Sequence, residues 1–177
     1  YHIHSKKIKS NVTFVMLADL HNQEYGEKNE ILIGEIEKIS PDFVCLAGDM
    51  LIGHSKYPYE AGQHAVAELT KKYPVFYGLG NHEARMQKET EIYGTRYEDY
   101  MKPLKESGTH VLVNEYKELM VGENRFKIYG YDLPMKYFEK FNRYVFEACQ
   151  IEEAMGKCED TSDCYHILLA HNPVYFQ

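Results

Sequence analysis

The order of apolar and amphipathic segments predicts an α/β fold. Short runs rich in Val, Leu and Phe, typical of buried strands, alternate along the first half of the chain with longer segments whose apolar residues recur every three or four positions. A strand, a helix and another strand in succession indicate parallel pairing with a right-handed crossover. We therefore expect a sheet core with helices outside it.

The first half of the chain is predicted to alternate strand and helix. The expected strands cover residues 12–18, 43–47 and 75–79, and the expected helices cover residues 26–39 and 57–72. Within each helix the apolar residues fall on one face, as they do in helices that pack on a sheet. Ser40-Pro41-Asp42 ends the first helix and Tyr73-Pro74 ends the second, because proline disrupts a continuing helix.

The second half is predicted to hold a hairpin, a further strand and two more helices. The expected strands cover residues 109–113, 116–121, 125–129 and 165–170, and the expected helices cover residues 95–106 and 136–155. Ser107-Gly108 ends the first of these helices, and the hairpin is expected to turn at Gly122-Glu123-Asn124. The predicted inner face of the last helix consists of Phe138, Phe141, Val145, Phe146 and Cys149.

Length and composition indicate one soluble globular domain. The 177 residues suffice for a single substantial core, and we expect residues 1–177 to form one domain. The formal net charge of −7 argues against a nucleic-acid-binding surface, which needs clustered Lys and Arg. No segment approaches the roughly twenty apolar residues of a membrane-spanning helix. The chain begins at Tyr1 rather than Met, so we expect membrane association only through a segment missing from it.

The four cysteines do not show the paired spacing of a zinc knuckle. Cys45 lies inside an apolar run and is expected to be a small buried hydrophobic residue. Cys158 and Cys164 flank an acidic segment, and they could close a small loop as a disulfide in an oxidising compartment or remain free thiols in a reducing one.

Polar residues with metal-binding side chains follow four of the predicted strands. They form the motifs Asp19-Leu20-His21, Gly48-Asp49, Gly80-Asn81-His82-Glu83 and His171-Asn172-Pro173. Alternation along a strand would place Asp19 and His21 on one side and turn Leu20 into the protein. Carboxylate, imidazole and amide groups are ligands of divalent metals, and open α/β sheets bind ligands beyond the carboxyl ends of their strands. The sequence therefore predicts a metal site at this edge.

These ordered motifs resemble those of the calcineurin-like metallophosphoesterase superfamily. Its sequence blocks run Asp-x-His, Gly-Asp, Gly-Asn-His-Asp/Glu, a lone His and Gly-His-x-His, and the first four match the motifs above. The fifth has no match, because the chain ends six residues after His171, and we expect the domain to be incomplete at its C-terminus. Gly48-Asp49 is not followed by the Asp-Arg-Gly of the protein phosphatases, so the chain is more similar to bacterial phosphohydrolases, which would place it in the cytoplasm or at a membrane.

The resemblance implies a metallophosphoesterase-like α/β sandwich with mixed sheets and outer helices. It also implies two divalent metal ions, for which Mn, Fe and Zn are equally compatible with these ligands. The implied ligands are Asp19 and His21 for the first ion, Asn81 and His171 for the second, and Asp49 as the bridge. His82 would face the substrate as the catalytic residue, and a metal-bound hydroxide would hydrolyse a small phosphomonoester or phosphodiester.

Three further residues are candidates for weaker roles. Asn22 could orient His21, bind substrate or simply form a turn, and His54 could contact a phosphate or lie exposed in its loop. Glu83 could cap the helix that follows its motif or hold His82 in place. A non-catalytic metal-binding scaffold or interaction module on the same fold is the alternative to an enzyme. The presence of His82, which the resemblance does not make a ligand, favours the enzyme.

Overall fold

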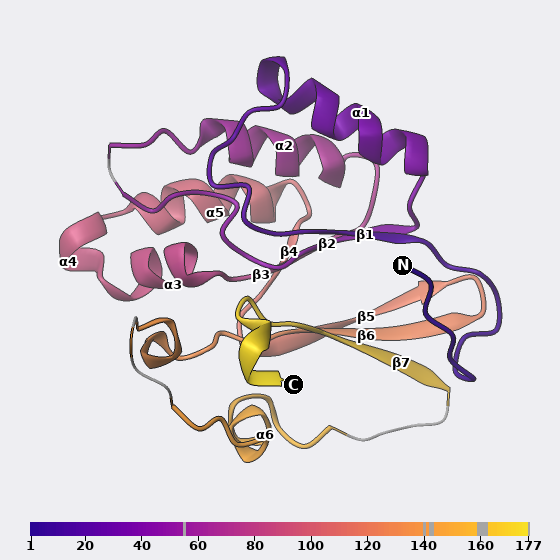
Figure 1. The fold of residues 1–177 in the computed structure, drawn as a ribbon. Helices are drawn as coiled ribbons and strands as arrows, with labels where there is room; N and C mark the ends of the chain where they lie inside the picture. Colours follow the sequence, from indigo (N-terminus) through magenta and orange to yellow (C-terminus); the bar gives the residue numbers. More distant parts are fainter. Residues whose placement is uncertain (55, 140, 142–143, 159–162, 177) are drawn as a thin grey trace.

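Two stacked β-sheets with helices outside them form the protein, as the computed structural model shows for residues 1–54, 56–139, 141, 144–158 and 163–176 (Figure 1). Sheet A is parallel, and its strands, in spatial order, are β1 (Phe14–Leu17), β2 (Phe43–Leu46), β3 (Val75–Gly78) and β4 (His110–Leu112). The predicted α/β architecture is confirmed, including the parallel pairing of the strands that alternate with helices.

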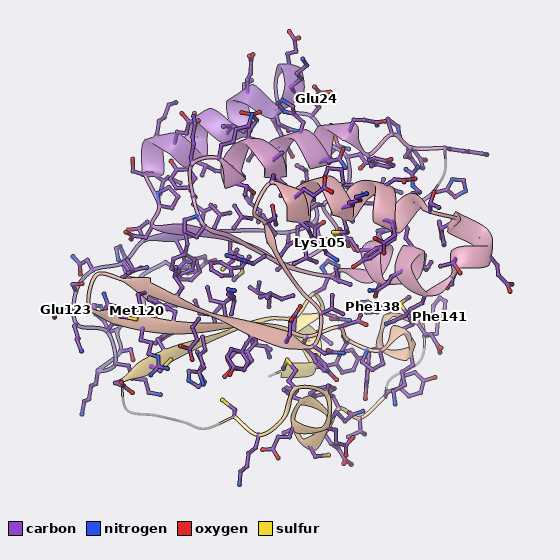
Figure 2. The ribbon with its side chains drawn as sticks, turned by 180° about the vertical axis from the view of Figure 1, so that it is seen from behind. Glu24, Lys105, Met120, Glu123, Phe138 and Phe141 are labelled. Atoms are coloured by element: carbon purple, nitrogen blue, oxygen red, sulfur yellow. The ribbon has the colours of Figure 1, made fainter. Side chains whose placement is uncertain are left out.

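Sheet B is mixed. Strands β5 (Glu115–Val121) and β6 (Asn124–Gly130) form the predicted antiparallel hairpin, and β7 (Cys164–Leu169) pairs with β6 in parallel. The hairpin turns at Gly122 and Glu123, and Figure 2 shows Met120 and Glu123 at the opposite end of the molecule from Phe138 and Phe141.

Helices cover the face of sheet A that points away from sheet B (Figure 1). This outer layer consists of the 3₁₀ turn η1 (Glu27–Asn29) and the helices α1 (Glu30–Ile39), α2 (Glu60–Thr70) and α5 (Arg96–Glu106). Helices α3 (Asn81–Lys88) and α4 (Thr90–Tyr93) follow β3 at one end of the sheet. The remaining elements are η2 (Met135–Phe138), α6 (Cys149–Met155) and η3 (Pro173–Phe176). None of the described helices is long and apolar enough to cross a membrane.

Strand β2 shows how alternation divides the core. Val44 and Leu46 pack into the layer between sheet A and the helices, whereas Phe43 and Cys45 pack between the two sheets. All four side chains are fully buried, so this central strand has no polar face. The sheets also approach closely at Gly130, where an added Cβ atom would lie 2.4 Å from the Leu112 carbonyl oxygen.

The predicted helix over residues 136–155 is wrong. The described part of that range forms η2, an irregular segment and only then α6, while residues 140, 142 and 143 lie outside the described residues. Its aromatic residues gather around Tyr137, whose ring lies 5.5 Å from that of Phe146 and 6.0 Å from that of Tyr144. Phe141 is fully exposed and has a left-handed φ of 73°, which a helix does not allow. The apolar spacing reflects an aromatic cluster rather than a helix face.

Three of the cysteines that the sequence analysis considered can be placed in the structure. Cys45 is buried between the sheets, as expected. Cys158 and Cys164 have free thiols, and the Cys158 Sγ atom lies 2.9 Å from Nδ1 of His166. Most of the loop between these two cysteines, residues 159–162, lies outside the described residues.

Candidate metal centre

Loops that follow strands of both sheets meet at one end of the molecule and bring the motif residues together (Figure 1). The loops after β1 and β2 are joined by backbone hydrogen bonds that continue the parallel pairing. Asp19 N donates to the Gly48 carbonyl at 3.1 Å, and His21 N donates to the Asp49 carbonyl at 3.0 Å. Asn81 is the first residue of α3, and His171 follows β7. The site therefore joins sheet A to sheet B.

The loop after β1 brings Asp19 and His21 together as expected, but its backbone conformation is not the expected extended strand. Strand β1 ends at Leu17, and Asp19, His21 and Asn22 have left-handed φ values of 56°, 49° and 58°. Leu20 is nevertheless buried, and Asp19 Oδ1 lies 3.6 Å from His21 Nε2. Left-handed conformations cost non-glycine residues on the order of 1 kcal/mol each and cluster at functional sites. The tight left-handed turn brings the two side chains together where simple alternation assumed a longer strand.

The Asp49 carboxylate is the common member of two groups of possible metal ligands. One group is His21, Asp49 and His82, the other is Asp19, Asp49 and His171, and the ligand atoms within each group lie within 4.8 Å of one another. Asp49 Oδ2 lies 3.3 Å from His21 Nε2 and 3.1 Å from His171 Nε2. Its other oxygen, Oδ1, accepts a 2.9 Å hydrogen bond from the backbone N–H of His82 in the first turn of α3.

The ionisation of this centre is set by the Asp49–His171 pair. Burial alone would raise the pKa of Asp49, but hydrogen bonds from His171 and the His82 backbone hold the pKa at about 2. Burial alone would lower the pKa of His171, but its hydrogen bond and ion pair with Asp49 raise the pKa to about 9. Without a metal ion, a proton on His171 therefore balances the buried carboxylate near neutral pH.

His171 is backed by a backbone carbonyl. Its Nδ1 atom lies 2.8 Å from the carbonyl oxygen of Ala47, and because that oxygen can only accept, Nδ1 must carry a hydrogen. The neutral ring then has its lone pair on Nε2, the atom that faces Asp49 and Asp19. Histidine ligands of metals are commonly oriented in this way by an outer acceptor.

The Asn81 side chain lies beside the Asp49 carboxylate. In the orientation that satisfies both groups, the amide donates a 3.2 Å hydrogen bond to Asp49 Oδ2 and accepts one of 3.2 Å from the backbone N–H of His82. A half-turn of the amide would present its oxygen on the Asp49 side instead, and an amide oxygen is a ligand of divalent metals. Once His171 has lost its proton, its Nε2 atom and the oxygens of Asp19, Asp49 and Asn81 form a ligand set that fits a divalent metal ion.

Glu83 is completely buried behind the centre and organises its backbone. Oε2 accepts from the N–H groups of Asp49 (2.9 Å) and Gly80 (3.0 Å). Oε1 accepts from the N–H of Met50 (3.0 Å) and the hydroxyl of Tyr77 (2.6 Å). Burial and the nearby charge of Asp49 raise the pKa of Glu83, while these hydrogen bonds act in the opposite direction. Glu83 both reaches back to the start of α3 and ties two ligand loops together.

The three remaining candidates lie in different surroundings. His82 packs edge-on against the ring of His21 at 5.5 Å, and burial lowers its pKa against the opposing charge of Asp49. Both polar atoms of the Asn22 amide are buried and have no hydrogen-bond partner in the described part of the chain. His54 is exposed; its ring contacts Tyr57, and its Nδ1 accepts from the N–H of Lys56. The structure does not bring His54 into either ligand group.

Several supporting groups gave no sequence signal. The Ala47 carbonyl and the Gly53 N–H, which contacts Nδ1 of His82 at 3.2 Å, are backbone groups that any residue type could supply. Tyr77 was expected only as part of an apolar strand, yet its hydroxyl binds Glu83. A tyrosine in a fully buried strand was the one available hint, because a buried hydroxyl needs a partner.

Comparison with known sequences identifies the family. The sequence model of the calcineurin-like phosphoesterases matches residues 12–176, which include every motif residue of the centre. The chain belongs to the calcineurin-like phosphoesterase family. No curated protein matches this member of the family. Among solved structures, it is similar to phosphopantetheinyl hydrolase from Mycobacterium tuberculosis, with 20% identity and a TM-score of 0.43. That match covers 67% of this calcineurin-like phosphoesterase and 41% of the hydrolase chain.

Proposed function

We propose that this calcineurin-like phosphoesterase is a dinuclear metal-dependent hydrolase of small phosphomonoesters or phosphodiesters. The observation that carries the proposal is the position of Asp49, which belongs to both ligand groups. A carboxylate shared in this way suits a bridge between two ions. The resemblance assigns Asp19 and His21 to one ion and Asn81 and His171 to the other, and Asp19 Oδ1 lies at similar distances from the Nε2 atoms of His21 (3.6 Å) and His171 (3.7 Å). The left-handed turn after β1 and the buried Glu83 support the same geometry.

The ions and the chain would divide the chemistry. When bound, two divalent ions neutralise the phosphate charge and supply an activated water as nucleophile. Asp49 holds its carboxylate ionised, with a pKa of about 2, so it is ready to ligate at neutral pH. His82 stands beside this centre, where it can contact a phosphate oxygen. Asn22 is a candidate substrate ligand, because its buried unpaired amide would otherwise cost about 1–3 kcal/mol.

Hydrolysis of generic substrates tests the proposal. We would measure release of 4-nitrophenol from bis(4-nitrophenyl) phosphate and from 4-nitrophenyl phosphate with added Mn²⁺, Fe²⁺ or Zn²⁺, alongside metal content per chain. Asp49→Asn removes the charge of the bridge at nearly constant shape. We expect turnover by the wild type that falls at least about 100-fold in this variant. The ratio of the two rates would identify the preferred ester class.

Two results would contradict the proposal. Fewer than one bound metal ion per chain after reconstitution would show that the protein has no stable metal centre. Two bound ions without turnover, and with His82→Ala binding ligands as the wild type does, would instead identify a metal-binding scaffold on the same fold.

A further inference from the structure

The Nδ1 atoms of two histidines in the centre contact opposite kinds of backbone group. His171 Nδ1 faces the carbonyl oxygen of Ala47 at 2.8 Å, whereas His82 Nδ1 faces the backbone N–H of Gly53 at 3.2 Å. A carbonyl oxygen only accepts a hydrogen bond, and an N–H only donates one. His171 therefore carries a hydrogen on Nδ1 whether or not Nε2 is also protonated, while Nδ1 of His82 must be bare and its ring hydrogen lies on Nε2.

We propose that the Gly53 backbone N–H is a positioning group that holds His82 in its Nε2–H form, so that His82 gives the substrate a hydrogen-bond donor and the metal centre no ligand. A neutral imidazole has one lone pair, and Gly53 occupies it. His21 and Asp49 are then the true ligands in the group that geometry alone would complete with His82. This inference rests on the proposed phosphoesterase function and names the backbone group that orients its central histidine.

Gly53 packs closely against α3. Gly53 is buried, and an added Cβ atom would lie 3.1 Å from the His82 carbonyl oxygen and 3.1 Å from Met86 Cγ. The backbone at Gly53 therefore lies directly beside the helix turn that carries His82, which keeps its N–H within hydrogen-bonding distance of the His82 ring.

The decisive measurement is the tautomer of His82 in the metal-free protein. Long-range ¹H–¹⁵N correlation spectra of protein labelled with ¹⁵N-histidine distinguish a ring protonated on Nε2 from one protonated on Nδ1. The His82 signal is assigned by its absence in His82→Gln. We expect His82 to show Nε2–H with a bare Nδ1, and His171 to show a hydrogen on Nδ1. A hydrogen on Nδ1 of His82 would overturn the inference, whether or not the protein hydrolyses any ester.

Two variants at Gly53 distinguish the effect of losing the backbone N–H from the effect of adding atoms in a crowded place. Gly53→Pro deletes the N–H, and Gly53→Ala keeps it while adding the same crowding against Met86. We expect Gly53→Ala to retain the Nε2–H signal and Gly53→Pro to show a mixture of tautomers. An unchanged His82 spectrum in a folded Gly53→Pro variant would contradict the positioning role.

Substitutions at His82 give a second test that does not depend on the folding of Gly53→Pro. Glutamine retains an N–H donor near the position of Nε2, whereas alanine does not. With Mn²⁺ and bis(4-nitrophenyl) phosphate, we expect His82→Ala to lower kcat about 100-fold and His82→Gln to recover about tenfold of that loss. Metal content should be unchanged in both variants. A loss of bound metal in His82→Ala would show that His82 is a metal ligand. Equal kcat in the two variants would show that an N–H donor alone does not replace His82, and that His82 acts by transferring a proton instead.

Discussion

At the scale of single residues, the centre depends on Glu83, a buried side chain that need not touch metal or substrate. It accepts four hydrogen bonds, three from backbone N–H groups and one from Tyr77. An ionised carboxylate has no hydrogen of its own, so every one of these donors meets an acceptor. The arrangement fixes the backbone of Asp49 and Met50 against the start of α3.

Glu83→Gln should therefore destabilise the protein although it preserves the shape of the side chain. One oxygen becomes an NH₂ group that must face two donors, and the buried hydrogen bonds lose their charge. We expect the free energy of unfolding, measured by urea denaturation, to fall by about 2–4 kcal/mol. Glu91→Gln, at an exposed position of α4, is the matched control and should change stability by less than about 0.5 kcal/mol. Equal effects of both substitutions would show that the buried network contributes little.

At the scale of elements, the turns after β2 and β3 touch through glycine. An added Cβ atom at Gly80 would lie 2.2 Å from Asp49 Oδ1 and 2.3 Å from the Asp49 backbone nitrogen. Gly48 has a left-handed φ of 89°, and its added Cβ atom would lie 2.3 Å from the Gly80 backbone nitrogen. The bridging carboxylate therefore reaches its place only because two neighbouring turns lack side chains.

Gly80→Ala should displace Asp49 and weaken both the fold and the centre. We expect a loss of about 2–3 kcal/mol in the free energy of unfolding, together with weaker Mn²⁺ binding by calorimetry. Gly34→Ala provides a control of opposite sign, because an added Cβ atom there meets nothing within 4 Å inside α1. That variant should be stabilised by about 0.5–1 kcal/mol and should bind Mn²⁺ as the wild type does. Wild-type affinity in Gly80→Ala would contradict the close approach.

Some elements of this protein could be predicted from its sequence, and others could not. The strands of sheet A and the polar residues at their ends were predictable. Each strand is a short apolar run, and the run is followed directly by residues with metal-binding side chains. The range 136–155 was misread because periodicity alone does not separate a helix face from an aromatic cluster around Tyr137. The left-handed turn at Asp19 and the N–H of Gly53 were not predictable, since neither depends on a residue type that marks it. Side-chain chemistry is visible in a sequence, but the backbone groups that orient it are not.

At the scale of the whole molecule, the centre connects the two sheets. Asp19 and Asp49 come from sheet A, and His171 follows β7 of sheet B. A metal ion bound between them would cross-link the sheets and bind only the folded chain. Mn²⁺ at about 100 times its Kd should therefore add about 2.7 kcal/mol to the free energy of unfolding and raise Tm. Calorimetric scans with and without Mn²⁺ check this, and a Tm shift that persists in Asp49→Asn would place the bound ion elsewhere.

The pH dependence of these effects follows from His171. Its pKa is raised to about 9, above the ordinary value of 6.5, so its contribution to the stability of the metal-free protein is full below pH 6.5 and is lost as the pH rises through 9. Metal binding at Nε2 must expel the same proton, so affinity should rise up to about tenfold per pH unit towards pH 9. At pH 7, calorimetry in buffers of different ionisation enthalpy should detect release of about one proton per bound site in the wild type and none from this position in His171→Ala. Binding that released no proton from the wild type would show that the Asp49–His171 pair is not opened by the metal, and the second ligand group would then have to form without His171.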